Sequence, residues 1–146
     1  GFESPTHATW SLTDPMALIR VPQCKKGKPD SMRVELRNPD PSCNPYLAFS
    51  VMLASGLEGI EKKYKLPEPV HPVKPNLNYH DSEHDKHPHL PTQLNEALLS
   101  FEKSSLMKNT LGEFIHSKFI ENKLYEMDKY NSYITDYEIN EYLPIL

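Results

Sequence analysis

Residues 33–37 read Arg33-Val34-Glu35-Leu36-Arg37, and this stretch decides how the first third of the chain is built. Its three charged residues alternate with Val34 and Leu36. Successive side chains of a β-strand point to opposite faces, so the alternation predicts a half-buried strand with one charged face. Side chains two residues apart lie about 6.5–7 Å apart on such a face, which places one guanidinium group on each side of a carboxylate.

The charged face of this strand is open to two interpretations. Arginine suits phosphate because its planar fork donates two parallel hydrogen bonds and stays protonated. A carboxylate between two arginines could hold Mg²⁺ or Mn²⁺, which prefer oxygen ligands and bridge to phosphate oxygens. One interpretation is therefore a site for polyphosphate and metal. The other is a solvated strand face whose Arg–Glu–Arg ion pairs contribute little to stability.

Two further extended segments precede this strand. Residues 17–21 are rich in β-formers and end at Pro22, and residues 6–12 mix β-formers with small residues. Residues 23–31 form a polar loop with a basic cluster, which predicts a hairpin-like pair on either side of it. If these strands pair, Arg20 lies on the face of the charged triplet, although a lone arginine on an edge strand would show the same pattern.

The segment after the strand begins with a helix signal. Asn44 is a favourable N-cap and Pro45 suits the first helical position. The predicted helix ends near Gly59, and it is apolar on most of its sides, so we expect it to be buried.

Residues 64–91 contain six prolines and five histidines and show neither helical nor strand periodicity. We expect a long surface loop. Its histidines suggest a zinc site, but no cysteine accompanies them and zinc needs rigidly held ligands. The composition is more typical of a polar loop. The histidines concerned are His71, His80, His84, His87 and His89.

The remaining residues read as helices. Apolar residues recur with helical spacing over 94–101, with Thr92 as the expected N-cap, and a second apolar stripe covers 107–119. Thr135 and Glu138 fit a capping box that opens a last short helix. The chain is thus expected to comprise strands and a buried helix over 1–63, a loop over 64–91 and helices over 92–146.

Composition excludes several classes of protein. The 146 residues carry 16 Lys and Arg against 20 Asp and Glu, a net charge of −4, which disfavours nucleic-acid binding. The longest apolar stretch, residues 46–57, is too short to span a bilayer, and no signal peptide is evident. Two cysteines form no disulfide framework and favour a reducing compartment. Ser11, His7 and Asp14 are close in sequence but lack a nucleophile motif, so we assign no hydrolase triad.

Several stretches, taken in order and with their spacing, resemble the C-terminal part of class I glutamine synthetase. Together they are specific, although each alone would be weak, and the resemblance spans nearly the whole chain. It implies that residues 1–146 are part of the catalytic domain, an α+β fold with antiparallel strands in the N-terminal third followed by helices. The stretches are Gly1–Pro5, Ala17–Pro22, Arg33–Asp40, Asn44–Phe49, Gly56–Ile60, Leu90–Pro91 with the helix that follows, and Thr135–Ile139.

The resemblance also implies an activity and roles for four residues. In this family ATP phosphorylates the side-chain carboxylate of glutamate, and ammonia then displaces phosphate from γ-glutamyl phosphate to give glutamine. Glu35 would bind Mg²⁺ or Mn²⁺, and Arg20 and Arg33 would bind the phosphates of ATP. Arg37 would act in catalysis by contacting glutamate or the transferred phosphoryl group. The family further implies a cytoplasmic homo-oligomer, expected to be a dodecamer, with no nucleic-acid or membrane partner.

One departure from the family pattern leaves alternatives open. Asp14-Pro15-Met16 stands where the family usually has Asn-Arg-Ser, so Pro15 replaces an arginine that helps to stabilise the phosphoryl group. This change predicts weaker catalysis, a substitute cation such as Lys25 or Lys26, or a different acceptor. A γ-glutamyl ligase that uses an amine, and a non-catalytic assembly module, are the alternatives. Because the family's N-terminal half is missing from the resemblance, we expect the 146 residues alone to be inactive.

Overall fold

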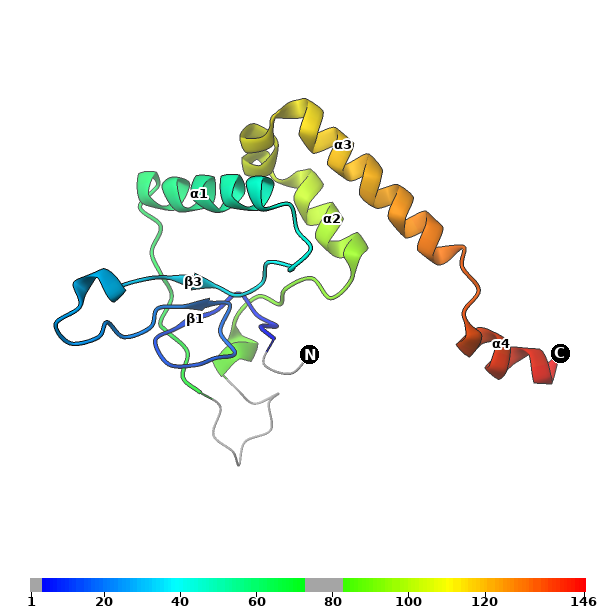
Figure 1. Ribbon diagram of the computed structural model, residues 1–146, viewed down its shortest axis with the longest axis horizontal. Helices are drawn as coiled ribbons and strands as arrows, with labels where there is room; N and C mark the ends of the chain where they lie inside the picture. The colour runs from blue at the N-terminus through cyan, green and yellow to red at the C-terminus, as the bar shows by residue number, and fades with distance from the viewer. Residues whose placement is uncertain (1–3, 73–82) are drawn as a thin grey trace. The chain divides into compact units, whose positions relative to one another are not determined.

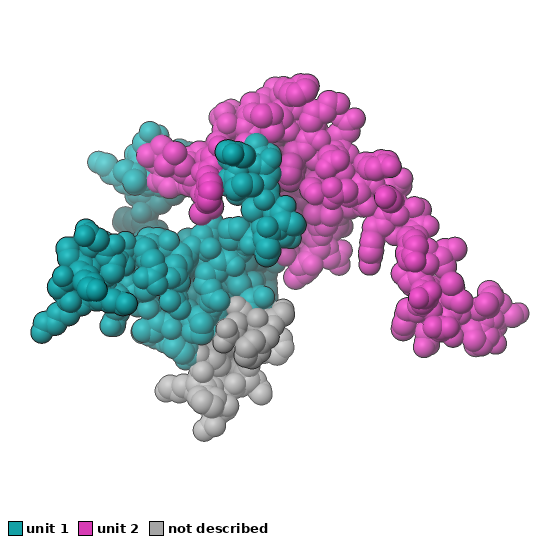
Figure 2. All heavy atoms as spheres, in the orientation of Figure 1, with its two compact units in different colours: residues 1–48, 58–90 teal, residues 49–57, 91–146 magenta. Residues whose placement is uncertain are grey.

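The computed structural model describes residues 4–72 and 83–146 (Figure 1). The chain divides into two compact units (Figure 2). The first comprises Gly1–Ala48 and Glu58–Leu90, and the second comprises Phe49–Leu57 and Pro91–Leu146. The expected division at residues 63 and 91 stays a prediction.

A three-stranded sheet forms the centre of the first unit. Its strands are β1 (Trp10–Ser11), β2 (Ile19–Arg20) and β3 (Glu35–Leu36), in the order β1-β2-β3. The α+β class with strands before helices is confirmed. The expectation of antiparallel strands throughout is wrong for β1 and β2, which run parallel. The chain folds back on itself between them and enters β2 in the direction of β1, whereas β2 and β3 are antiparallel.

The pairing of β2 with β3 confirms the hairpin-like arrangement expected around the basic loop. Ile19 lies opposite Leu36 and Arg20 lies opposite Glu35. The backbone N–H of Arg37 donates to the carbonyl of Leu18 at 3.0 Å, which extends the ladder beyond the strand ends. The loop between the strands contains a single 3-10 turn, η1 (Pro29–Ser31).

Part of the histidine-rich segment packs against β1, so the expectation of a surface loop is wrong at two positions. Val70 is 2% exposed, and its backbone N–H donates to the carbonyl of Trp10 at 2.9 Å. Its carbonyl accepts from Ser11 Oγ at 2.6 Å. Further along, the 3-10 turn η3 (Glu83–Lys86) buries His84 to 1% exposure. Composition alone cannot show these contacts, because they join residues distant in sequence.

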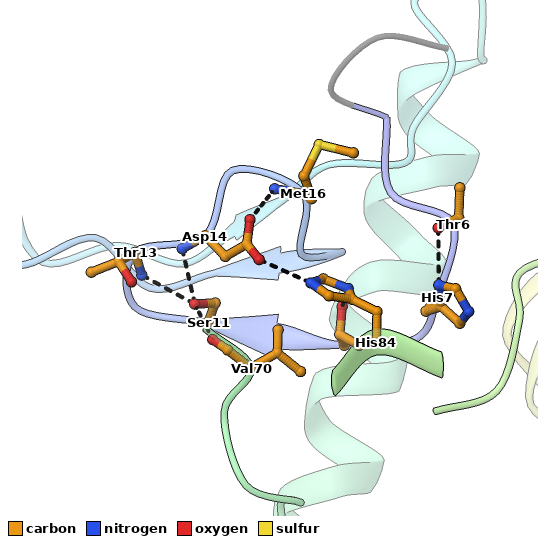
Figure 3. Close-up of polar contacts among 9 residues, drawn as sticks. Thr6, His7, Ser11, Thr13, Asp14, Met16, Val70 and His84 are labelled. Carbon is orange, nitrogen blue, oxygen red and sulfur yellow. Dashed lines mark hydrogen bonds and ion pairs between the residues drawn. The ribbon is translucent and has the colours of Figure 1, made fainter. Parts of the chain in front are cut away.

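A buried polar network fixes the turn between β1 and β2 (Figure 3). The Asp14 carboxylate holds His84 Nε2 with one oxygen, at 2.9 Å, and accepts the backbone N–H of Met16 with the other, at 2.8 Å. Ser11 Oγ accepts the backbone N–H of Asp14 at 2.9 Å. Both partners in the Asp14–His84 contact have side chains only 1% exposed. The network therefore ties η3 to the turn that leads into β2.

Helix α1 (Pro45–Glu61) begins where the sequence predicts. The Asn44 side chain caps it by accepting the backbone N–H groups of Tyr46 and Leu47. The expected burial of this helix is wrong, because none of its residues is buried. Tyr46 is 82% exposed and Phe49 is 67% exposed. Apolar side chains on most sides of a helix indicate that burial would be favourable, but burial also requires other residues to pack against those sides.

The second unit contains the C-terminal helices. Helix α2 (Leu94–Lys103) packs on α3 (Ser105–Asn131), with Phe101 stacked on the ring of His116 at 4.8 Å between centroids. The expected cap Thr92 is wrong, since the N-cap is Gln93 and Thr92 instead binds the Glu96 carboxylate.

Helix α3 is interrupted at Gly112, whose φ of 76° and ψ of 157° favour glycine. The apolar stripe expected over 107–119 therefore crosses a kink. The capping box of Thr135 and Glu138 is confirmed at the start of α4 (Asp136–Tyr142), and a last turn, η4 (Leu143–Ile145), follows. Backbone and side-chain hydrogen bonds from Thr135 lower the pKa of Glu138.

Replacing Asp14 tests whether the buried network holds the fold together. We expect Asp14→Ala to lower the free energy of unfolding by about 1–3 kcal/mol, because the substitution leaves the buried His84 Nε2 without this partner. Asp14→Asn keeps an oxygen for Met16 and should lose less. Urea denaturation of the intact gene product measures both variants, and wild-type stability in Asp14→Ala would contradict the assigned role.

Candidate functional site

The β2–β3 register brings three of the four predicted site residues together. We call Arg20, Arg33 and Glu35 the Arg–Glu–Arg cluster. Arg20 lies directly opposite Glu35 across the two strands. Arg33 precedes β3 and shares a strand face with Glu35 by alternation. The cluster therefore joins side chains from two strands, as expected if those strands pair.

Both oxygens of Glu35 are engaged by arginine. Arg20 Nε lies 3.0 Å from Oε2, whereas Arg33 places both Nε and Nη2 within 2.8 Å of Oε1. This is the arrangement that the ion-pair interpretation predicts. The same contacts hold two guanidinium groups around one carboxylate, which the phosphate interpretation requires. The geometry alone is compatible with both.

Exposure shows that the cluster is accessible from solvent. The side chains of Arg20 and Glu35 are 32% and 30% exposed, and that of Arg33 is 53% exposed. Ion pairs this open are screened by water and contribute about 0–1 kcal/mol each. An incoming anion can therefore replace the carboxylate as the partner of a guanidinium group at small cost in stability.

Arg37, the fourth predicted residue, follows β3 directly. Its backbone N–H donates to Leu18, so its position is set by the same ladder that carries the cluster. Its side chain is half-buried. The alternation of the strand places it on the face of Arg33 and Glu35.

The donor set at Glu35 fits a hard divalent cation. Mg²⁺ is usually held by one or two carboxylates together with phosphate oxygens and water. Glu35 supplies one such carboxylate, and the neighbouring arginines supply partners for phosphate. A cation would compete with Arg20 or Arg33 for a Glu35 oxygen.

The sequence did not predict the buried contacts that Asp14 and His7 make. Asp14, one of the three residues that depart from the family pattern, is a buried structural group bound to His84. Ser11 Oγ donates to the carbonyl of Val70. His7 contacts His89, which lies 82 residues later in the sequence. No local sequence pattern indicates a contact over such a separation. His80 lies outside the described residues.

Two guanidinium groups around one carboxylate are groups that suit phosphate, and they lie on a small sheet that precedes a set of helices. The model of the glutamine synthetase catalytic domain matches residues 1–142, and the chain belongs to this family. Glutamine synthetase from Mycolicibacterium smegmatis is 41% identical over 145 residues, which are 99% of this chain and 32% of that protein. The enzyme from Methanococcus voltae is 39% identical with the same coverage. The chain thus spans about a third of the length of these relatives.

Solved structures agree with this assignment. A GmaS–ADP complex superposes with a TM-score of 0.77 and 27% identity, over 97% of this chain and 30% of that one. Plasmodium falciparum glutamine synthetase gives a TM-score of 0.81 over 97% of this chain and 35% of that one. Its identity of 20% makes it a comparison of fold alone. Within residues 4–72 and 83–146, no helix combines the length and apolarity needed to cross a membrane.

Removing the most exposed arginine of the cluster tests whether it serves stability. We expect Arg33→Ala to change the free energy of unfolding by less than about 1 kcal/mol, because an exposed ion pair contributes little. Chemical denaturation of the intact gene product measures this value. A loss of several kcal/mol would identify Arg33 as a structural residue and weaken the case for a binding role.

Proposed function

We propose that this chain contributes one wall of the active site of an ATP-dependent ligase. The reaction joins ammonia to the side-chain carboxylate of glutamate through γ-glutamyl phosphate and gives glutamine. Membership of the glutamine synthetase family supports the reaction class. The observation that carries the proposal is the convergence of Arg20 and Arg33 on Glu35. The working protein is proposed to be a cytoplasmic homo-oligomer.

Each residue of the cluster has a role that follows from its chemistry. Arg20 and Arg33 bind phosphate oxygens of ATP, since a guanidinium group offers paired donors and a permanent charge. Glu35 binds Mg²⁺ or Mn²⁺, whose charge would offset that of the phosphates when bound. Arg37 contacts glutamate or the transferred phosphoryl group and is the proposed catalytic residue. Phosphoryl transfer depends chiefly on positioning and charge stabilisation, which these residues supply.

The nucleotide is the best-supported ligand in this proposal. The superposed GmaS structure is a complex with ADP, and it is 27% identical to this chain over the matched residues. That similarity covers 97% of this chain. A nucleoside triphosphate is therefore the ligand class to test first.

Removing the Arg37 guanidinium tests the catalytic assignment. We expect Arg37→Ala to lower the kcat for glutamine formation by about 10²–10³-fold, the usual cost of losing one group that stabilises transition-state charge. The assay uses the intact gene product with glutamate, ammonia, ATP and Mg²⁺. Lys62→Ala is the matched control, since it removes one positive charge from an ion pair with Glu58 on α1. Unchanged turnover in Arg37→Ala would remove it from the site.

The identity of the acceptor is tested separately. Pro15 and its neighbours replace the family's usual Asn-Arg-Ser, and Asp14 is committed to the buried network. These facts keep an amine-using γ-glutamyl ligase as the second candidate. We expect ammonia to give the highest kcat/KM in a panel that also contains alkylamines and diamines. Preference for an amine by tenfold or more would favour the second candidate, and no product with any acceptor would favour a non-catalytic module.

A further inference from the structure

Two histidines and one aspartate meet in the first unit, and none of them belongs to the Arg–Glu–Arg cluster. His7 Nε2 lies 3.2 Å from His89 Nε2 and 3.4 Å from Asp85 Oδ1. The three ligand atoms all lie within 4.8 Å of one another. His7 is 1% exposed, whereas His89 and Asp85 face solvent. We infer that His7, Asp85 and His89 form a site for a nitrogen-preferring divalent transition metal, represented by Zn²⁺.

Two of the three separations between the ligand atoms fit one coordination shell. Zinc binds imidazole nitrogen and carboxylate oxygen at about 2.0–2.2 Å, so two tetrahedral ligands lie about 3.4 Å apart. The two contacts that His7 makes have this length. Three protein ligands leave the fourth position of a tetrahedral ion to water or another external group.

The backbone places the two histidines on the same face. His7 and His89 form an antiparallel bridge, flanked by a hydrogen bond from Ala8 N–H to Pro88 and another from Leu90 N–H to Thr6, both 2.8 Å. Side chains directly opposite one another in such a bridge have Cβ atoms about 4.5–5.5 Å apart. The rings therefore meet because of the fold, and a bound ion would join the segment before β1 to the end of the histidine-rich segment.

The second ring nitrogen of His7 has a partner that orients the ring. Thr6 Oγ1 lies 2.9 Å from His7 Nδ1. Metal-binding histidines commonly hold their other nitrogen in this way, which leaves Nε2 free to bind the ion. His84 lies close by, with its ring centroid 6.1 Å from that of His7, but its Nε2 binds Asp14. The site therefore uses His89 as its second histidine.

The charge state of His7 also suits a metal ligand. Burial lowers the pKa of His7, the neighbouring His89 lowers it further, and Asp85 acts in the opposite direction. A lower pKa favours the neutral ring, which is the form that binds a metal. Two imidazoles select zinc, copper or nickel over Mg²⁺ and Mn²⁺, which prefer oxygen. This preference separates the site from the one proposed at Glu35.

Calorimetric titration with Zn²⁺ tests the inference. The intact gene product is freed of metal with a chelator and titrated with Zn²⁺ in excess Mg²⁺, which fills oxygen-only sites. We expect His89→Gln and Asp85→Asn to weaken one binding event per chain by at least about 100-fold, more than the loss of an orienting partner costs. Both residues face solvent, so the variants should fold, and circular dichroism checks this. Equal Zn²⁺ affinity in the wild type and both variants would overturn the inference.

Two control variants make the result specific. His71→Gln removes an exposed histidine of the same segment and should leave Zn²⁺ affinity unchanged. Glu35→Gln alters the proposed active site and should also leave it unchanged, so failure of the metal inference is distinguishable from failure of the proposed function. Bound Zn²⁺ should raise the melting temperature of the wild type but not that of His89→Gln. A loss of affinity in His71→Gln equal to that in His89→Gln would show diffuse binding by the histidine-rich segment and refute the site.

Discussion

The direct pairing of Arg20 with Glu35 across β2 and β3 is the constraint on which the candidate site depends. Each strand is only two residues long, yet a shift of one residue in the register would turn the Glu35 side chain to the opposite face. The backbone bonds of Arg37 to Leu18 and of Ile19 to Thr9 hold that register on both sides of β2. The geometry of the cluster thus depends on a short ladder of backbone hydrogen bonds. Other contacts in the first unit must stabilise this ladder.

Most of the buried side chains of the first unit are polar. Among its described residues, the buried apolar side chains are Ala17 and Val70, whereas His7, Thr9, Ser11, Asp14 and His84 are buried polar groups. A buried polar group is costly unless its hydrogen bonds are made, so each one tolerates few alternative positions. The Asp14–His84 contact and the bond from Ser11 to Val70 therefore specify where the histidine-rich segment lies. The departure from the family pattern at Asp14 has a structural consequence in addition to any catalytic one.

Local signals in the sequence predicted the elements well, and long-range contacts account for the errors. The Asn44 cap and the capping box at Thr135 each involve residues a few positions apart, and both are confirmed. The alternation around Glu35 predicts a half-buried strand over residues 33–37, which is only partly confirmed, because β3 covers Glu35–Leu36 and Val34 is 67% exposed. The errors concern the exposure of α1, the parallel pairing of β1 with β2 and the packing of Val70. Each of these depends on residues distant in sequence, which local periodicity does not reveal. The Arg–Glu–Arg cluster can be predicted from the sequence, because a single hairpin-like pairing of two strands brings Arg20 opposite Glu35. The contact of His7 with His89 cannot be predicted in this way, because it joins residues 82 positions apart.

The two sites proposed here use opposite ligand chemistry within one unit. Glu35 offers oxygen between arginines, which suits a hard cation accompanied by phosphate. His7 and His89 offer nitrogen in a partly buried corner, which suits a softer ion. The chain runs from His7 into β1, and β1 supports β2, which carries Arg20. An ion that joined His7 to His89 would therefore restrain the segment that leads into β1, and its ligands would be distinct from those of the cluster.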